Sequence, residues 1–406
     1  MLKNYLIPSK KILFMPDAIN SLDSGAHSAR ATLDYLHKLN YKVAVYAMDV
    51  TKNSPWDECQ SIKMYKIPTN LRWYEFIYSP VLMRDFIKIL EEFQPDYIFF
   101  TGSIQKPAIM AKEARKRGIK VVYLFYINDY FCQSIYAGLD SGPCTECISK
   151  SRISALKNGC ISYYKILDWI KSELTRFILG REIRKCYKFL GYGKDQLLIA
   201  RQFGIKAEKL SLIGFQFSPK DLQSTIIKDS GYFALTGSSI MQKGWHLLSS
   251  IFSKLDSQIR IKISFKDLST AEWAINKYNL TCFVDSGLLE IVTGLNDRQR
   301  YLDFLASSRA VLLPSYYPTT GEFVLQESMF FQKPVHVFEV GVHKDILING
   351  YNAMTSSIGN MDDYAHKINL IDKDKNLRLM VGKNAYITSK SFYDTESLNL
   401  LKNVFL

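Results

Sequence analysis

Carboxylate, hydroxyl and glycine residues gather in the stretch 312–335, which reads LLPSYYPTTGEFVLQESMFFQKPV. Glu327 can accept hydrogen bonds from two neighbouring hydroxyl groups of a ligand, because a carboxylate has two acceptor oxygens. Thr320, Gly321 and Glu322 precede a predicted helix, whose first N–H groups have no partner inside the helix and suit an anion. The stretch therefore indicates a ligand-binding site.

A strand, a loop, a helix and a second strand must position these side chains. Residues 310–313 form an apolar run of strand length, and turn residues follow from Pro314 to Gly321. Helical spacing begins at Phe323, and Pro334 ends it before a second apolar run. In an open parallel sheet, such a loop lies at the carboxyl ends of the strands, where ligands bind.

The same alternation of strands and helices runs through the chain and predicts an α/β fold with parallel sheets. Residues 215–229 have no firm periodicity, so they predict a linker between two domains. Strands are expected at 11–15, 42–48, 62–67, 96–101, 120–126, 197–200 and 210–214, and then at 232–236, 260–265, 289–293 and 310–313.

Polar residues also follow two predicted strands of the first half. Gly25 lies in a predicted turn at 23–25, and His27 follows it before a helix expected at about 28–39. Asn128 and Asp129 come directly after the strand at 120–126. An amide can bind a hydroxyl group but cannot exchange a proton near neutral pH, so any acid–base role falls to Asp129 or to a substrate phosphate. A plain turn explains the pair about as well.

Four of the seven cysteines lie close together in the sequence. Four thiolates can close a tetrahedral zinc site, and a Cys-x2-Cys pair with an earlier and a later Cys has the form of a zinc knuckle. The outer spacings are not those of a standard zinc finger, so four free thiols are the stronger alternative. The clustered residues are Cys132, Cys144, Cys147 and Cys160.

Composition excludes a disordered or fibrous chain, since 406 residues with 47% hydrophobic content can form two cores. No run has the length of a membrane span, and the first twenty residues lack the apolar core of an export signal. We therefore expect a cytoplasmic protein.

The formal charge of +13 lies almost entirely in the first half of the chain. Residues 1–215 hold 32 Lys and Arg against 20 Asp and Glu, and the remainder holds 20 against 19. The segment 151–191 is basic and has helical spacing, which suits contact with an anionic membrane surface. A domain helix with a basic solvent face explains it nearly as well. No nucleic-acid-binding motif is present, so nucleic acid is not an expected partner.

The stretch 312–335 resembles the signature of GT-B fold retaining glycosyltransferases of family 4 (group 1), in which a proline-serine loop leads to two glutamates eight residues apart. Glu327 stands where the second glutamate belongs, Thr319 stands at the first, and Glu322 lies three residues further on. The resemblance implies two Rossmann-like domains, 1–217 on the acceptor side and 218–388 for the nucleotide-sugar. It also implies a C-terminal helix, 389–406, that crosses back to the first domain.

The segment 237–244 resembles the donor-phosphate loop of the same family. Lys243 matches the lysine of that loop, whereas Ser238 stands where an arginine is usual. The resemblance implies that Lys243 neutralises the donor diphosphate and that Glu327 binds the ribose hydroxyl groups. It assigns further donor contacts to Gly25, Ser238, Thr319, Thr320, Gly321 and Glu322, acceptor contacts to His27 and Asn128, and catalytic roles to Asn128, Asp129, Lys243 and Glu322.

The activity implied is transfer of a hexose, with retention and without a metal, from a nucleotide-sugar to a saccharide. No cofactor is required, and zinc would be structural. The basic first domain favours a lipid-linked acceptor at the inner face of the membrane, as in bacterial capsule, O-antigen, lipopolysaccharide or exopolysaccharide assembly. Because Thr319, Asn128 and Ser238 depart from the family pattern, a non-catalytic partner or scaffold of an active glycosyltransferase is an alternative. A nucleotide-sugar epimerase of the same fold is another.

Overall fold

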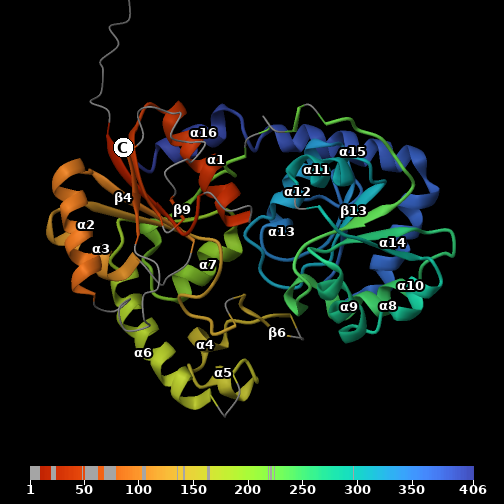
Figure 1. Ribbon diagram of the computed structural model, residues 1–406, viewed down its shortest axis with the longest axis horizontal. Coiled ribbons are helices and arrows are strands. Elements are labelled where there is room, and N and C mark those ends of the chain that lie inside the picture. The colour runs from red at the N-terminus through yellow and green to blue at the C-terminus, as the bar shows by residue number, and fades with distance from the viewer. Residues whose placement is uncertain are drawn as a thin grey trace, which may run out of the picture. The chain divides into compact units, whose positions relative to one another are not determined.

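The chain forms two compact units of α/β structure (Figure 1). Unit 1 comprises Met1–Ala137, Thr145–Phe217 and Thr395–Leu406, and unit 2 comprises Gly138–Cys144 and Ser218–Asp394. The computed structural model describes residues 10–19, 24–47, 49–50, 63–67, 79–102, 107–134, 136–139, 142–161, 165–217, 219, 222–223, 225–295 and 297–406.

Unit 1 is built on a seven-stranded parallel sheet of order β3-β2-β1-β4-β5-β8-β9. Its strands are β1 (Lys11–Pro16), β2 (Lys42–Ala47), β3 (Lys63–Lys66), β4 (Tyr97–Gly102), β5 (Lys120–Phe125), β8 (Lys188–Gly191) and β9 (Leu210–Leu212). Its helices are α1 (Ser24–Lys38), α2 (Pro80–Phe93), α3 (Pro107–Lys116), α4 (Glu146–Ser149), α5 (Ser154–Lys157), α6 (Ile166–Ile183), α7 (Lys194–Gln202) and α16 (Thr395–Lys402).

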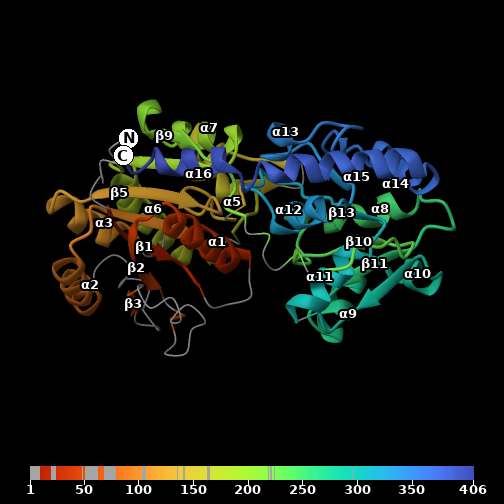
Figure 2. The same cartoon turned by 90° about the horizontal axis from the view of Figure 1, so that it is seen from above.

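Alternate residues of these strands pack into two layers, because successive side chains of a strand point to opposite faces. Phe100 and Tyr123 face α2, α3 and the end of α6 in one apolar core. Tyr97 and Phe99 face the other way and pack with Phe405 at the end of the chain. Figure 2 shows α1 and α16 on this second face.

One predicted strand of this unit is wrong. Residues 197–200 belong to the helix α7, and the strand that pairs between β5 and β9 is β8. A run of four apolar residues has no periodicity that separates strand from helix. At the start of this helix the amide of Gln196 donates to the carbonyl of Phe125, and its Oε1 accepts from the N–H of Tyr192.

Unit 2 is built on a six-stranded parallel sheet of order β12-β11-β10-β13-β14-β15. The strands are β10 (Phe233–Leu235), β11 (Ile261–Ser264), β12 (Leu289–Val292), β13 (Ala310–Leu313), β14 (Val335–Phe338) and β15 (Met354–Ser356). The helices are α8 (Leu248–Phe252), α9 (Leu268–Lys277), α10 (Thr281–Asp285), α11 (Arg298–Ala306), α12 (Phe323–Phe330), α13 (His343–Ile346), α14 (Met361–Lys373) and α15 (Lys375–Lys390). A short antiparallel hairpin, β6 (Gly138–Leu139) with β7 (Gly142–Pro143), belongs to this unit.

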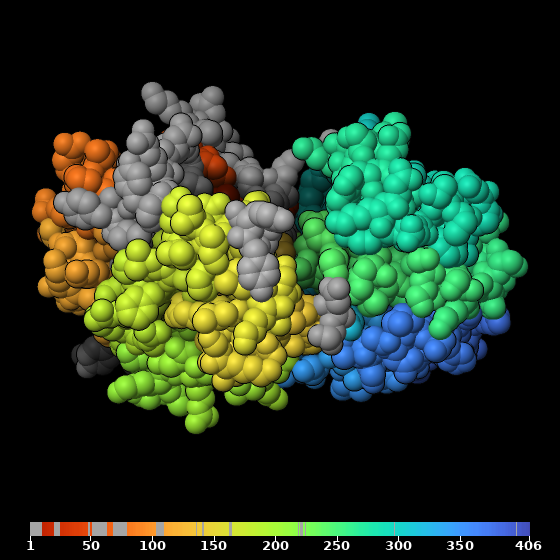
Figure 3. All heavy atoms as spheres, turned by 90° about the horizontal axis from the view of Figure 1, so that it is seen from below, coloured from red at the N-terminus to blue at the C-terminus, as the bar shows by residue number. Residues whose placement is uncertain are grey.

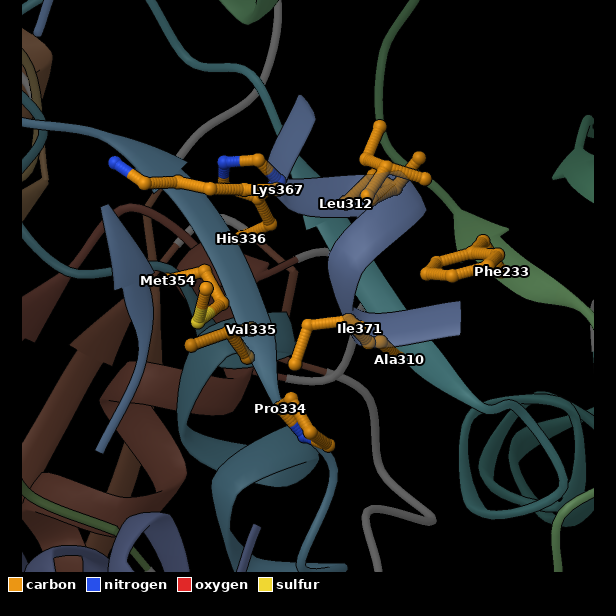
Figure 4. A pocket seen from close by; sticks show the side chains of 10 residues that line it. Phe233, Ala310, Leu312, Pro334, Val335, His336, Met354, Lys367 and Ile371 are labelled. Carbon is orange, nitrogen blue, oxygen red and sulfur yellow. The ribbon is translucent and has the colours of Figure 1, made fainter. Parts of the chain in front are cut away.

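The core between α14 and the sheet contains a small gap, drawn in Figure 4. His336 and Lys367 line it together with aliphatic side chains such as Leu312 and Ile371. The gap has no room for a water molecule, and the ring of His336 stacks on Tyr364 with centroids 3.7 Å apart. It is therefore a packing defect of the core and not a ligand site.

The last residues of the chain pack on unit 1. The ring of Phe405 lies 5.2 Å from that of Tyr97 and 5.7 Å from that of Tyr41, between centroids. The hydroxyl of Tyr41 donates to the carbonyl of Lys402. Over the residues that the structure describes, no helix combines the length and the apolar character needed to cross a membrane.

Candidate functional site

The loops after β10 and β13 meet at the carboxyl edge of the unit 2 sheet. β10 pairs with β11 on one side and with β13 on the other, so the chain leaves β10 in one direction along the sheet and later returns to its opposite side. This is the topological switch point of an open parallel sheet, where ligands bind. Lys243 lies on the first loop and Glu322 at the end of the second.

The two loops are locked together by backbone contacts. The N–H of Tyr316 donates to the carbonyl of Gln242 at 2.7 Å. Gly244 has φ +77°, and a Cβ there would lie 1.9 Å from the carbonyl oxygen of Pro314. Only glycine fits this contact, because both the left-handed conformation and the space exclude a side chain. The position of Lys243, one residue earlier, is fixed as a consequence.

Lys243 and Glu322 form an ion pair, and two further side chains hold the carboxylate. The hydroxyl of Ser315 donates to Glu322 Oε1 at 2.6 Å, and Nε2 of His343 lies 3.2 Å from Glu322 Oε2. Nδ1 of His343 lies 3.0 Å from the carbonyl oxygen of Phe338, so both ring nitrogens face acceptors. His343 therefore links Glu322 to the end of β14.

The charges of this cluster reinforce one another. Burial by itself raises the pKa of Glu322, but the charges of Lys243 and His343 outweigh it and hold that pKa below its ordinary 4.5. Burial lowers the pKa of Lys243, and the carboxylate of Glu322 outweighs it and raises that pKa above 10.5. Both groups are therefore charged near neutral pH. The side chain of Lys243 is 23% exposed, so it is partly open to solvent.

Thr319, the position of the missing first glutamate, has a structural role. It is buried, its carbonyl accepts from the N–H of Val342 at 3.0 Å, and its hydroxyl accepts from the N–H of Gly321 at 3.3 Å. A Cβ on Gly341 would lie 2.3 Å from the carbonyl oxygen of Thr319, so the turn before α13 packs directly on this loop. Thr320 follows at an intermediate burial.

Glu327 lies further along α12 and is only 1% exposed. Nη2 of Arg298, in the first turn of α11, is 2.6 Å from Glu327 Oε1. Tyr301 lies on the same helix, and burial followed by the charge of Glu327 raises the pKa of its hydroxyl well above 10. The carboxylate predicted to bind ribose is therefore covered by an arginine in this structure. Ser238, at the other end of the first loop, is exposed.

In unit 1 the prediction for Gly25 needs a correction. Gly25 lies in the first turn of α1 rather than in a turn before the helix, because α1 begins at Ser24 and not near residue 28. Its φ is not in the left-handed region. His27 lies two residues further along α1 and is half-buried.

Asn128 and Asp129 follow β5 and are both buried. The carbonyl of Asn128 accepts from the N–H of Cys132 at 2.8 Å, which closes a turn. Arg176 on α6 holds this turn, since its Nε donates to the carbonyl of Asp129 at 2.7 Å and its Nη2 to that of Cys132 at 3.2 Å. The prediction missed Arg176, because its partners are backbone atoms more than 40 residues away.

The four clustered cysteines form no disulfide. Cys132 is buried, and its Sγ lies 3.2 Å from the hydroxyl of Ser134. No group of three or more His, Cys, Asp or Glu side chains suits a metal ion within the described part of the chain, which includes all four cysteines. The structural zinc stays a prediction.

Sequence reasoning also missed Ser315, His343, Arg298 and Tyr301. Ser315 stands in the proline-serine loop, and His343 stands in the segment 338–348. Both lie next to motifs that were recognised. Arg298 follows the helix-capping Asp297, whose carboxylate accepts from the N–H of Arg300 at 2.9 Å. Nothing in the local pattern connects these residues to α12, because the contacts depend on the tertiary fold.

Comparison with protein families finds a match in the second unit. Residues 223–388 match the family model described as Glycosyl transferases group 1. The match lies within unit 2. The matched region contains both loops of the switch point, and the predicted relationship to group 1 is confirmed. A comparison with curated protein sequences finds no match.

Solved structures of GT-B glycosyltransferases resemble the whole chain, which confirms the predicted fold class. HepE from Anabaena, in complex with UDP and glucose, has 13% identity and a TM-score of 0.67, with 98% of each chain covered. Sucrose-phosphate synthase from Thermosynechococcus elongatus has 12% identity and a TM-score of 0.70, again over 98% of each chain. The lipopolysaccharide outer core galactosyltransferase WaaB has 14% identity and a TM-score of 0.59, over 97% of this chain and 99% of its own.

Proposed function

We propose that this protein is a glycosyltransferase that moves a sugar, with retention, from a nucleoside diphosphate sugar to a lipid-linked saccharide. The observation that carries the proposal is the Lys243–Glu322 pair at the switch point of the glycosyltransferase domain. An ammonium group has three donors, and Glu322 takes one of them. Its positive charge suits the diphosphate of a sugar nucleotide.

In the proposed reaction the acceptor hydroxyl attacks the anomeric carbon while the bond from that carbon to the diphosphate oxygen breaks. The acceptor proton passes to the departing phosphate oxygen. Lys243 stabilises the charge that develops on this diphosphate, which is the largest electrostatic demand of the step. Thr320 and Gly321 line the approach to it, and Asn128 and Asp129 serve the acceptor side. Because Lys243 supplies the positive charge, the reaction as proposed needs no metal ion or organic cofactor.

Two observations support the proposed acceptor and location: the charge of the first half of the chain and the resemblance in fold to WaaB. The basic first half of the chain favours an acceptor with a lipid phosphate at the inner face of the cell membrane. WaaB, which resembles the chain in fold, is by its description a lipopolysaccharide galactosyltransferase. We accordingly propose a role in the assembly of a bacterial surface polysaccharide.

A second candidate is a non-catalytic partner of an active glycosyltransferase. The contact that favours it is the ion pair of Arg298 with Glu327, which occupies the carboxylate that would otherwise bind ribose. Such a protein would bind no sugar nucleotide, or would bind one without consuming it.

The test is incubation of the purified protein with a panel of UDP-sugars and GDP-sugars, with release of the nucleoside diphosphate followed over time. UDP-sugars come first because HepE was solved with UDP. Release that is lost in Glu327→Ala supports the proposal. Binding without release favours the partner, and isomerised sugar without an acceptor indicates an epimerase. With an acceptor, the anomeric configuration of the product distinguishes retention from inversion.

A further inference from the structure

The outer face of α6 carries a row of exposed apolar side chains. Leu167 is 68% exposed, Ile170 50%, Leu174 51% and Phe177 51%. The steps of three, four and three residues place all four on one face of the helix, and we call them the α6 stripe. Exposed apolar residues are normal when scattered singly, but a contiguous row on one element marks an interaction surface.

The stripe faces outward because the opposite side of α6 is fixed to unit 1. Arg176, Leu179 and Ile183 are buried. Arg176 donates to the carbonyls of the turn after β5, and Glu182 forms an ion pair with Arg115 on α3. A helix held by these contacts cannot rotate to bury the stripe in its own unit. Within the part of unit 1 that the structure describes, the stripe is therefore left open to a partner.

Positive charge borders the stripe. Lys171 and Arg181 are exposed on α6, and Lys185 is exposed just after it. Lys171 lies 3.6 Å from exposed Asp168 and Lys185 3.3 Å from Glu182, surface pairs that contribute little energy. Over residues 142–188 the chain has ten Lys and Arg against four Asp and Glu. Figure 3 shows the yellow-green atoms of α6 beside the yellow atoms of the preceding segment on one face of unit 1.

Apolar side chains with a cationic border fit one class of partner best. A second copy of the chain would bring the same cations against each other, because a two-fold interface repeats the same surface. An anionic bilayer accepts both features, since acyl chains take the apolar residues and headgroup phosphates take the cations. We propose that α6 docks unit 1 on an anionic lipid bilayer through the α6 stripe, with Lys171, Arg181 and Lys185 at the headgroups.

The role of this docking rests on the proposed function, because a lipid-linked acceptor lies in a bilayer. The turn that Arg176 holds contains Asn128 and Asp129, so the helix that meets the bilayer also positions the residues assigned to the acceptor. A lipid-linked saccharide would then be met at the surface where its lipid resides. The docking itself needs neither donor nor acceptor, so it can be tested apart from the reaction.

The experiment is co-sedimentation of the full chain with vesicles, either pure phosphatidylcholine or a two-to-one mixture with phosphatidylglycerol. We expect binding to the anionic vesicles that falls with added salt, and a loss of roughly tenfold in the double variant Leu174→Ser with Phe177→Ser. The matched control is Leu198→Ser with Leu212→Ser. These residues lie in the same unit at 53% and 45% exposure and should leave binding unchanged.

Two results would overturn the inference. One is equal vesicle binding by the wild type and the stripe variant, or none by the wild type. The other is a dimer in sedimentation velocity that the stripe variant abolishes, which would assign the surface to a second copy. Thermal melting checks that each variant is folded. Nucleoside diphosphate binding is measured without vesicles, so a failure of the proposed function appears there independently.

Discussion

At the scale of single residues, the carboxylate that pairs with Lys243 is that of Glu322, three residues after Thr319. Thr319, which stands where the resemblance expects the first glutamate, is buried and makes no part of this ion pair. Ser315 and His343 hold the carboxylate from two further elements. The cluster holds one lysine, with a partly exposed side chain, on a rigid support, an arrangement that suits the proposed diphosphate site.

The acid sensitivity of unit 2 tests this cluster. Because the pKa of Glu322 is lower in the folded state than the ordinary 4.5, its stabilisation is present above about pH 4.5 and is lost as the pH falls. Glu322→Gln should therefore flatten the decline of melting temperature between about pH 6 and pH 3. The control Glu272→Gln removes an exposed carboxylate of α9 and should follow the wild type. A Glu322→Gln curve parallel to the wild type would contradict the ion-pair account.

Arg298 provides a second test at this scale. Glu327 is buried, so removal of its cation leaves a charge without compensation. We expect Arg298→Gln to lower the free energy of unfolding by about 3 kcal/mol, as for other broken buried pairs. Arg300→Gln, at an exposed position of the same helix, should cost less than about 0.5 kcal/mol. Equal values from urea denaturation would show that Arg298 does not hold Glu327.

At the scale of elements, the site depends on the loops after β10 and β14, each of which packs without space against the loop after β13. Gly244 and Gly341 are the contact points, and each lies against the backbone of the segment 314–320. Contacts between backbone atoms therefore hold these loops in place. The loops in turn set the positions of Lys243 and Glu322.

Gly244→Ala tests the loop contact. The new Cβ meets the carbonyl of Pro314, so the loop must move and carry Lys243 with it. We expect a loss of about 2–4 kcal/mol in stability and loss of nucleoside diphosphate binding. Gly287→Ala has nearly the same positive φ of +74° but open space, and should cost only the backbone strain of about 1–2 kcal/mol. Equal effects of the two substitutions would refute the close approach.

Elements with strong periodicity could be predicted from the sequence, and long-range contacts could not. The strand at 310–313 and the helix from Phe323 were correct because turn residues separate them sharply. The strand at 197–200 was wrong, since a short apolar run fits either structure. The motifs singled out Lys243 and Glu322 but did not predict their ion pair, and the roles of the two residues stay predictions. The contacts of His343 and Arg298 arise from the sheet order, which no local pattern encodes.

At the scale of the whole molecule, each of the two units is built from more than one segment of the chain. Unit 1 is completed by Thr395–Leu406, which follow all of unit 2 in the sequence. Phe405 is fully buried against the rings of Tyr97 and Phe99. The stability of the first unit therefore depends on the last residues of the chain.

Phe405→Ala measures this dependence. A buried phenylalanine truncated to alanine typically costs about 3–5 kcal/mol, and the cost here should fall on unit 1. Hydrogen exchange should show faster exchange in β4 while β13 is unchanged. Leu406→Ala, at the exposed neighbouring position, is the control and should alter neither strand. Equal loss of protection in both strands would mean that the units unfold together.

The central claim is that unit 2 binds the diphosphate of a sugar nucleotide through Lys243. Calorimetric titration with UDP and with GDP tests it most directly, using the wild type, Lys243→Ala and the control Lys262→Ala, whose lysine pairs with Glu290 elsewhere in the same unit. We predict that the wild type and Lys262→Ala bind one of the nucleotides alike. Lys243→Ala should bind it at least about tenfold more weakly, a difference of about 1.4 kcal/mol. Equal affinity of Lys243→Ala and the wild type would contradict the account.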